Sequence, residues 1–111
     1  MTLEALKNFG ANTQEGMARC MNNEAFYLRL VGMLSKDTNV EKLSQALLAN
    51  DLNAAFEAAH ALKGSLSNLA ITPVLEPVVE ITEHLRARES MDYMPLMQKI
   101  QDNWDGLMKL L

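Results

Sequence analysis

Residues 51–69 read DLNAAFEAAHALKGSLSNL, and this stretch decides the fold class. Its apolar residues recur every three or four positions, which is the spacing of one face of an amphipathic α-helix. They are Leu52, Ala55, Phe56, Ala59, Leu62, Leu66 and Leu69. Asn50 suits a left-handed cap of a preceding helix and Asp51 suits an N-cap, so we predict a helix from about Leu52 to Asn68.

The same periodicity continues on both sides of this helix. Asn23 caps a helix that is interrupted at residues 36–39 and restarts at a capping box of Thr38 and Glu41. Two further helices follow, one starting at Thr72-Pro73 and one N-capped by Asp92. The apolar stripe of the interrupted helix is Phe26, Leu30, Met33, Leu34, Val40, Leu43, Ala46 and Leu47. The stripes of the two later helices are Leu75, Val78, Thr82 and Leu85, and then Leu96, Ile100, Trp104, Leu107 and Leu111. Four main helices with short connections predict an all-α fold, an antiparallel up-down four-helix bundle.

Two local features predict departures from a regular four-helix bundle. Leu3, Leu6 and Phe9 share one face before a break at residues 10–13, which predicts one or two short additional N-terminal helices. Pro77 removes one hydrogen bond from the interior of its helix, so we expect a kink or a late start there.

Length and composition restrict the class of protein. The 111 residues suit one domain, residues 1–111, with residues 1–21 as a helical extension and residues 22–111 as the bundle. The single Cys20, expected to be a small apolar residue, and an N-terminus unlike a secretory signal predict a cytoplasmic location. A formal charge of −4 without a basic patch, and without a long apolar run, makes nucleic acid and membrane unexpected partners.

His60 is the main candidate for chemistry. At 100° per residue it lies about 130° from the centre of its helix's apolar stripe and therefore faces outward. Gly64 follows one turn later on the same face, Glu57 and Ser67 are nearby, and Lys63 lies at the edge of the stripe.

This combination suits phosphoryl transfer. A neutral imidazole nitrogen is a competent nucleophile near physiological pH, and it must protrude to reach a phosphate held by another protein. Lys63 at i+3 can place its positive charge beside the phosphorylated ring. Gly64 costs roughly 1 kcal/mol relative to alanine in a helix interior, and close approach of a partner's backbone is a reason to have glycine there.

The run from Ala58 to Ser65, AAHALKGS, followed by Asn68-Leu69 and Thr72-Pro73, closely resembles the histidine phosphotransfer (HPt) domain. The resemblance implies a phosphorelay protein that accepts a phosphoryl group on Nε2 of His60 from a receiver-domain aspartate or a sensor histidine kinase and passes it to a response regulator. It implies that Lys63 steadies the phosphoryl group and that Gly64 clears room for docking. We therefore expect a monomeric carrier that is not an enzyme and has no cofactor, with Mg²⁺ only in the partner receiver.

Two positions depart from the family pattern. Ala70 stands where the family usually has glycine, so the left-handed glycine cap expected after the helix is missing. Thr82 stands where the family often has Glu or Gln opposite the active histidine. Thr82, Glu57 or water could supply the hydrogen bond that orients the ring, and Ser67 is a further supporting candidate.

Other interpretations of the same residues remain. Glu57 and His60 form a Glu-x-x-His pair, which di-iron bundles use twice, but the sequence has no second one, and a metal site is not expected. A helical adaptor without chemistry is the other alternative.

We expect His84 to pair on the surface with Glu80. Met33, Met97 and Met108 are expected to fill the core.

Overall fold

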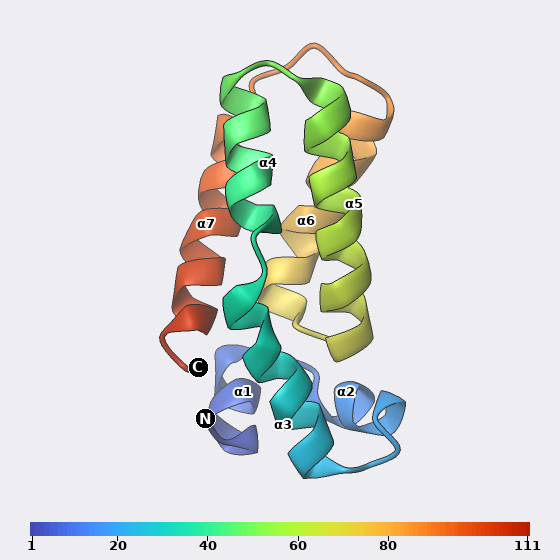
Figure 1. The fold of residues 1–111 in the computed structure, drawn as a ribbon, viewed down its shortest axis with the longest axis vertical. Coiled ribbons are helices and arrows are strands. Elements are labelled where there is room, and N and C mark those ends of the chain that lie inside the picture. Colours follow the sequence, from blue (N-terminus) through green and yellow to red (C-terminus); the bar gives the residue numbers. More distant parts are fainter.

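The computed structural model describes all residues, 1–111, and consists of helices without strands (Figure 1). Seven α-helices and one short 3₁₀-helix, η1, follow one another along the chain. They are α1 (Leu3–Phe9), α2 (Thr13–Arg19), α3 (Glu24–Gly32), η1 (Met33–Lys36), α4 (Asn39–Leu48), α5 (Leu52–Leu69), α6 (Thr72–Arg86) and α7 (Met94–Met108). None of these helices is both long enough and apolar enough to cross a bilayer.

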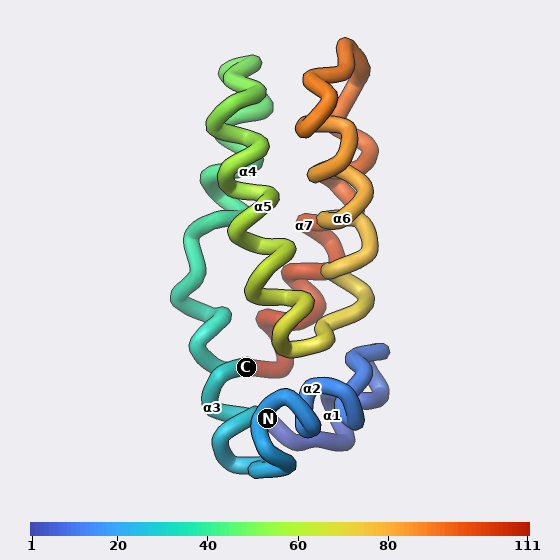
Figure 2. The backbone as a smooth tube through the Cα atoms, turned by 90° about the vertical axis from the view of Figure 1, so that its right-hand side faces the viewer, coloured from blue at the N-terminus to red at the C-terminus, as the bar shows by residue number.

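Helices α4, α5, α6 and α7 form an antiparallel up-down four-helix bundle (Figure 1). The predicted fold class is therefore confirmed, including the short N-terminal helices, which are α1 and α2. Figure 2 shows α1, α2 and α3 grouped at the end of the bundle where α5 stops and α6 starts. Helix α3 thus lies beside the bundle's end, and the irregular segment after η1 leads from it into α4.

Apolar side chains from every part of the chain meet in one buried cluster that extends from Leu6 to Leu107. Cys20 is buried in it, as expected for a small apolar residue. The prediction for the methionines is right for Met97, which is buried, and for Met108, which is partly buried and packs against the core, and wrong for Met33, which is 58% exposed. Met33 begins η1, and the change from α to 3₁₀ geometry there interrupts the periodicity on which the prediction rested.

The caps around α4 and α5 test the local predictions. Asn50 is left-handed, with φ of 54°, and the carboxylate of Asp51 accepts a hydrogen bond from the amide of Ala54 at 3.1 Å, so both are confirmed. The capping box at Thr38 is wrong. Thr38 has φ −97° and ψ 3°, which is not the extended conformation of an N-cap, and its side chain makes no capping bond. Instead, Asp37 accepts from the amide of Asn39 at 2.8 Å.

Pro77 does not delay α6, which begins at Thr72 and continues to Arg86. A proline at this position leaves the carbonyl oxygen four residues earlier, that of Pro73, without its helical donor. The side-chain amide of Asn103 on α7 donates to that oxygen at 2.9 Å. A side chain from the neighbouring helix therefore replaces the lost backbone bond and ties α6 to α7.

The turn after α5 is left-handed although it has no glycine. Ala70 has φ 56° and ψ 44°, and the amide of Ile71 donates to the carbonyl of Leu66 at 3.0 Å, which closes a Schellman motif. Three groups from the N-terminal helices reach the same turn. The amide of Asn12 donates to the carbonyl of Ala70 at 2.9 Å, the guanidinium of Arg19 donates to that of Ser67, and the hydroxyl of Tyr27 donates to that of Leu69 at 2.9 Å.

Candidate functional site

His60 lies near the middle of α5 and its side chain is exposed, as the helical periodicity predicts. The adjoining residues Ala58 and Ala59 are buried against the rest of the bundle, which turns His60 to the opposite side. Its ring stacks on that of Phe56, one turn earlier, with 5.6 Å between the ring centroids and 18° between the ring planes. An imidazole presented in this way is open to a partner and is supported on one face by an aromatic ring.

Gly64 follows His60 by one turn and is open to solvent. Beyond the adjoining residues and backbone of its own helix, a Cβ atom added to it would meet no atom within 4 Å, so packing inside the molecule does not require glycine at this position. Gly16 differs, because a Cβ atom there would lie 2.5 Å from the ring of Tyr27. Gly32 is as open as Gly64 but lies at the end of α3. Gly64 therefore leaves a shallow, smooth surface beside the imidazole.

Lys63 lies on the other flank of His60 and is half-buried. The three ion pairs in the molecule join Arg19 to Glu15, His84 to Glu89 and Arg86 to Glu83, so the Lys63 ammonium is not neutralised by a carboxylate. An unpaired cation three residues from an exposed imidazole is free to interact with an anion placed on that ring.

The side chains predicted to orient or support the ring, Thr82, Glu57 and Ser67, make no hydrogen bond to it. Thr82 is fully buried, and its hydroxyl donates to the carbonyl of Val78, one turn earlier on α6, at 2.6 Å. Glu57 is exposed and lines a hollow between α4 and α5. Ser67 is half-buried and makes no side-chain hydrogen bond, although its carbonyl accepts from Arg19. None of the three forms a hydrogen bond with the ring of His60.

Phe56 supports the imidazole, and Arg86 and Arg88 lie against Phe56; none of the three was predicted from the sequence as a site residue. The Cζ atoms of Arg86 and Arg88 each lie 5.1 Å from the centroid of the Phe56 ring. An aromatic residue four positions before a helical histidine is a readable signal, since i and i+4 side chains meet on a helix. The arginines come from the end of α6 and the turn after it, so their proximity depends on the tertiary structure.

His84 has a different partner from the one predicted. Its Nδ1 atom lies 2.7 Å from a carboxylate oxygen of Glu89, and it does not pair with Glu80. The chain reverses at Arg88, with φ of 52°, and the amide of Glu89 donates to the carbonyl of His84 at 3.2 Å. The turn after α6 thus brings Glu89 back over the histidine, which a helical i, i+4 rule does not anticipate.

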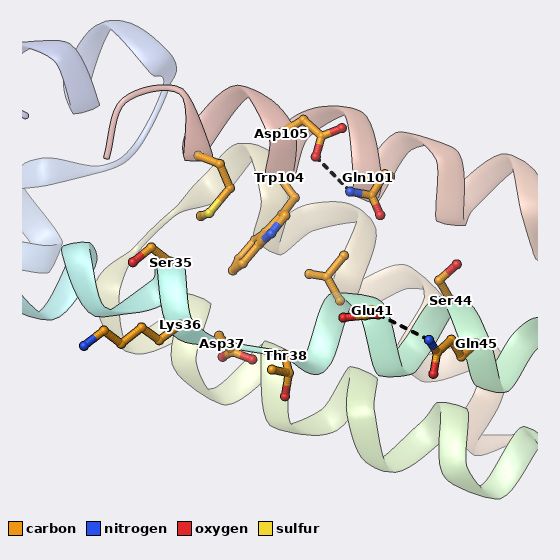
Figure 3. Close-up of a pocket in the computed structure, with 12 residues that line it drawn as sticks. Ser35, Lys36, Asp37, Thr38, Glu41, Ser44, Gln45, Gln101, Trp104 and Asp105 are labelled. Carbon is orange, nitrogen blue, oxygen red and sulfur yellow. Dashed lines mark hydrogen bonds between the residues drawn. The ribbon is translucent and has the colours of Figure 1, made fainter.

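A groove of about 560 Å³ lies on another face, between α7 and the segment from η1 to α4 (Figure 3). Two of its three acidic side chains accept hydrogen bonds within their own helices, Glu41 from Gln45 at 3.3 Å and Asp105 from Gln101 at 2.8 Å, and the third, Asp37, accepts from the amide of Asn39. Trp104 forms part of its wall, and no histidine or cysteine lines it. Nowhere in the molecule do three or more His, Cys, Asp or Glu side chains come together as a metal ion would require.

The fold and the site define a class of protein: an antiparallel helical bundle that presents one histidine from the middle of a central helix. A family model described as the Hpt domain matches residues 35–109, from η1 to the end of α7. The chain therefore belongs to the Hpt domain family. Members of this family carry phosphoryl groups on histidine in phosphorelays, with receiver domains and kinases as partners, and are carriers rather than catalysts. In the two other comparisons, no curated protein and no solved structure matches the chain.

Proposed function

We propose that this chain is a phosphorelay intermediate that receives a phosphoryl group on His60 and passes it to a response regulator. The observation that carries the proposal is the exposure of His60 in the middle of α5, inside the segment matched by the Hpt family. The other histidine, His84, is engaged with Glu89 at 2.7 Å near the end of α6. Only His60 adjoins an unpaired ammonium and an open glycine.

The donor in this scheme is an aspartyl phosphate on a receiver domain or a phosphohistidine on a sensor kinase. The lone pair of a neutral ring nitrogen, which we assign to Nε2, forms a bond to phosphorus while the bond from phosphorus to the donor atom breaks. An aspartate leaves as its carboxylate, and Nδ1 of His60 keeps its proton. Transfer to a second receiver runs the same exchange in reverse. Mg²⁺ belongs to the receiver, and this chain needs no cofactor of its own.

Lys63 and Gly64 have separate parts in this scheme. A phosphorylated imidazole carries about two negative charges, and the free ammonium of Lys63 can lie against them in a charge-assisted contact. The open surface above Gly64 lets the receiver's backbone approach the ring, where a larger side chain would hold it away. We place the exchange in the cytoplasm and expect the carrier to act as a monomer.

The test is phosphoryl transfer from a purified receiver that has been phosphorylated with acetyl phosphate. Wild type and His84→Gln should both gain one phosphoryl group, and His60→Gln should gain none. The two substitutions make the same chemical change, at the exposed His60 and at the partly buried His84 beside Glu89, so the His84 variant controls for a general effect of replacing a histidine. A helical adaptor would bind receivers but gain no phosphate in any of the three proteins, and that outcome would refute the proposal.

A further inference from the structure

The ring of His60 makes an aromatic contact within the molecule, the stack on Phe56. The two residues are one turn apart on α5, their centroids are 5.6 Å apart and their planes are inclined by 18°. This lies inside the range of about 4.5–7 Å in which aromatic pairs attract one another in offset-stacked geometry. No side chain donates a hydrogen bond to the ring or accepts one from it, so hydrogen bonding within the chain does not fix its direction.

Phe56 is itself held in place from a second helix. It is half-buried against the core, and the guanidinium carbons of Arg86 and Arg88 each lie 5.1 Å from its ring centroid. Arg88 is anchored, because its Nε donates to the side-chain oxygen of Asn53 at 2.9 Å and its guanidinium also donates to the carbonyl of Leu85. The aromatic support of His60 is thus tied to the end of α6 as well as to α5.

The direction of the imidazole matters for the proposed reaction. An exposed side chain on a helix exchanges among staggered rotamers, and only some of these point the attacking nitrogen away from the helix toward a partner. Phosphoryl transfer needs the attacking atom, phosphorus and leaving atom roughly in line. A stack that favours one rotamer therefore raises the fraction of molecules ready to react when the receiver docks.

We infer that Phe56 is a positioning residue for His60, and that Arg86 and Arg88 hold Phe56 in the orientation that this requires. The inference rests on the proposed function of His60 and adds to it a device for orienting the ring. Stacking on Phe56 takes the place of the hydrogen bond that was predicted from Thr82 or Glu57. The arginines act on His60 through the phenyl ring.

Three substitutions separate this role from a structural one. Phe56→Leu keeps an apolar side chain against the core but removes the stack, and Phe56→Tyr restores it. Phe9→Leu is the matched control, because Phe9 is also half-buried but packs near Gly106, away from His60. The first readout is the NMR shift of the His60 ring protons, which a stacked phenyl ring displaces by its ring current. The second is the rate of phosphoryl gain as the concentration of phosphorylated receiver is varied.

The expected result is a change of the His60 proton shifts in Phe56→Leu, with wild-type shifts in Phe56→Tyr and Phe9→Leu. The maximal transfer rate should fall about three- to tenfold in Phe56→Leu, the range that corresponds to losing one aromatic pair, while the half-saturating receiver concentration stays unchanged. A wild-type rate in Phe56→Leu, an equal loss in Phe9→Leu, or no recovery in Phe56→Tyr would overturn the inference. A wild type that gains no phosphate would instead refute the proposed function, and with it the positioning role.

Discussion

The hydroxyl of Tyr27 on α3 donates a hydrogen bond to the carbonyl oxygen of Leu69 at 2.9 Å, and it does so in a fully buried position. Leu69 is the last residue of α5, so the bond satisfies a carbonyl that the helix itself leaves without a donor. Two further donors, from Asn12 and Arg19, reach the neighbouring carbonyls. The N-terminal helices therefore act as a cap for the helix that carries His60.

Tyr27 makes this cap sensitive to alkali. Burial, with a smaller contribution from the charge of Cys20, raises the pKa of Tyr27 to about 12 from its usual value of 10.0. Tyr27 ionises at a lower pH in the unfolded chain than in the folded protein. The stability that its neutral hydroxyl contributes is therefore complete below pH 10 and is lost as the pH rises from 10 toward 12. Urea unfolding at pH 9 and pH 11 should show a loss of stability in wild type. Tyr27→Phe should lose less over the same interval, and an equal loss would exclude Tyr27 as the cause.

Gly16 should tolerate no larger side chain, because α2 packs its backbone against Tyr27 and Leu69. A Cβ atom at Gly16 would lie 2.5 Å from the Tyr27 ring and 2.8 Å from the Leu69 carbonyl oxygen. Gly16→Ala should therefore lower the free energy of unfolding by about 1–3 kcal/mol. Gly32→Ala is the control, since a Cβ there meets nothing within 4 Å. Equal effects of the two substitutions in denaturant titrations would contradict this explanation.

Gly64 should show stability and activity changing in opposite directions. Gly64→Gln puts a better helix former at an exposed position with open space and should stabilise the fold by up to ~1 kcal/mol. The same side chain would stand beside the imidazole and hinder the receiver, so phosphoryl gain should slow. Thermal unfolding and transfer rates on one preparation test both effects. A variant that accepts phosphate at the wild-type rate would show that docking does not pass over Gly64.

Lys63 should matter after phosphorylation more than before it. Lys63→Ala should leave the stability of the unphosphorylated protein nearly unchanged. It should shorten the lifetime of the phosphohistidine roughly ten- to hundredfold, since the lost charge contact is worth ~1–3 kcal/mol. Lys63→Arg keeps the charge but changes the reach of the side chain, so its phosphohistidine lifetime should fall between those of wild type and Lys63→Ala. Added salt should narrow the differences, because the contact is partly exposed. The measurement is the decay rate of the phosphohistidine in the three proteins at two ionic strengths. Identical lifetimes in all three would mean that Lys63 is only a solvated surface residue.

Patterns within single helices predicted much of this molecule. The periodicity around Leu62 and the Asn50-Asp51 caps give α5 its position and turn His60 outward, because both depend on neighbours a few residues away. Interactions between helices could not be predicted in the same way. The bond from Asn103 to Pro73 spans α7 and α6, and it explains why Pro77 does not disrupt its helix.

The left-handed Ala70 likewise depends on distant residues. A non-glycine residue in this conformation costs roughly 1–2 kcal/mol, which the bonds from the N-terminal helices help to offset. The arginines around Phe56 are a similar case at the candidate site, since they approach from the end of another helix. Local sequence therefore indicated where the histidine points, whereas tertiary packing determines what supports it.

We propose that one nitrogen of His60 carries the phosphoryl group. The most direct test is to incubate the wild-type chain with a phosphorylated receiver and to locate the adduct by mass spectrometry at neutral to alkaline pH. We expect one phosphoryl group on His60, bound as a phosphoramidate that acid hydrolyses and base does not. Phosphate on His84, on a hydroxyl side chain, or in an acid-stable form would contradict the account.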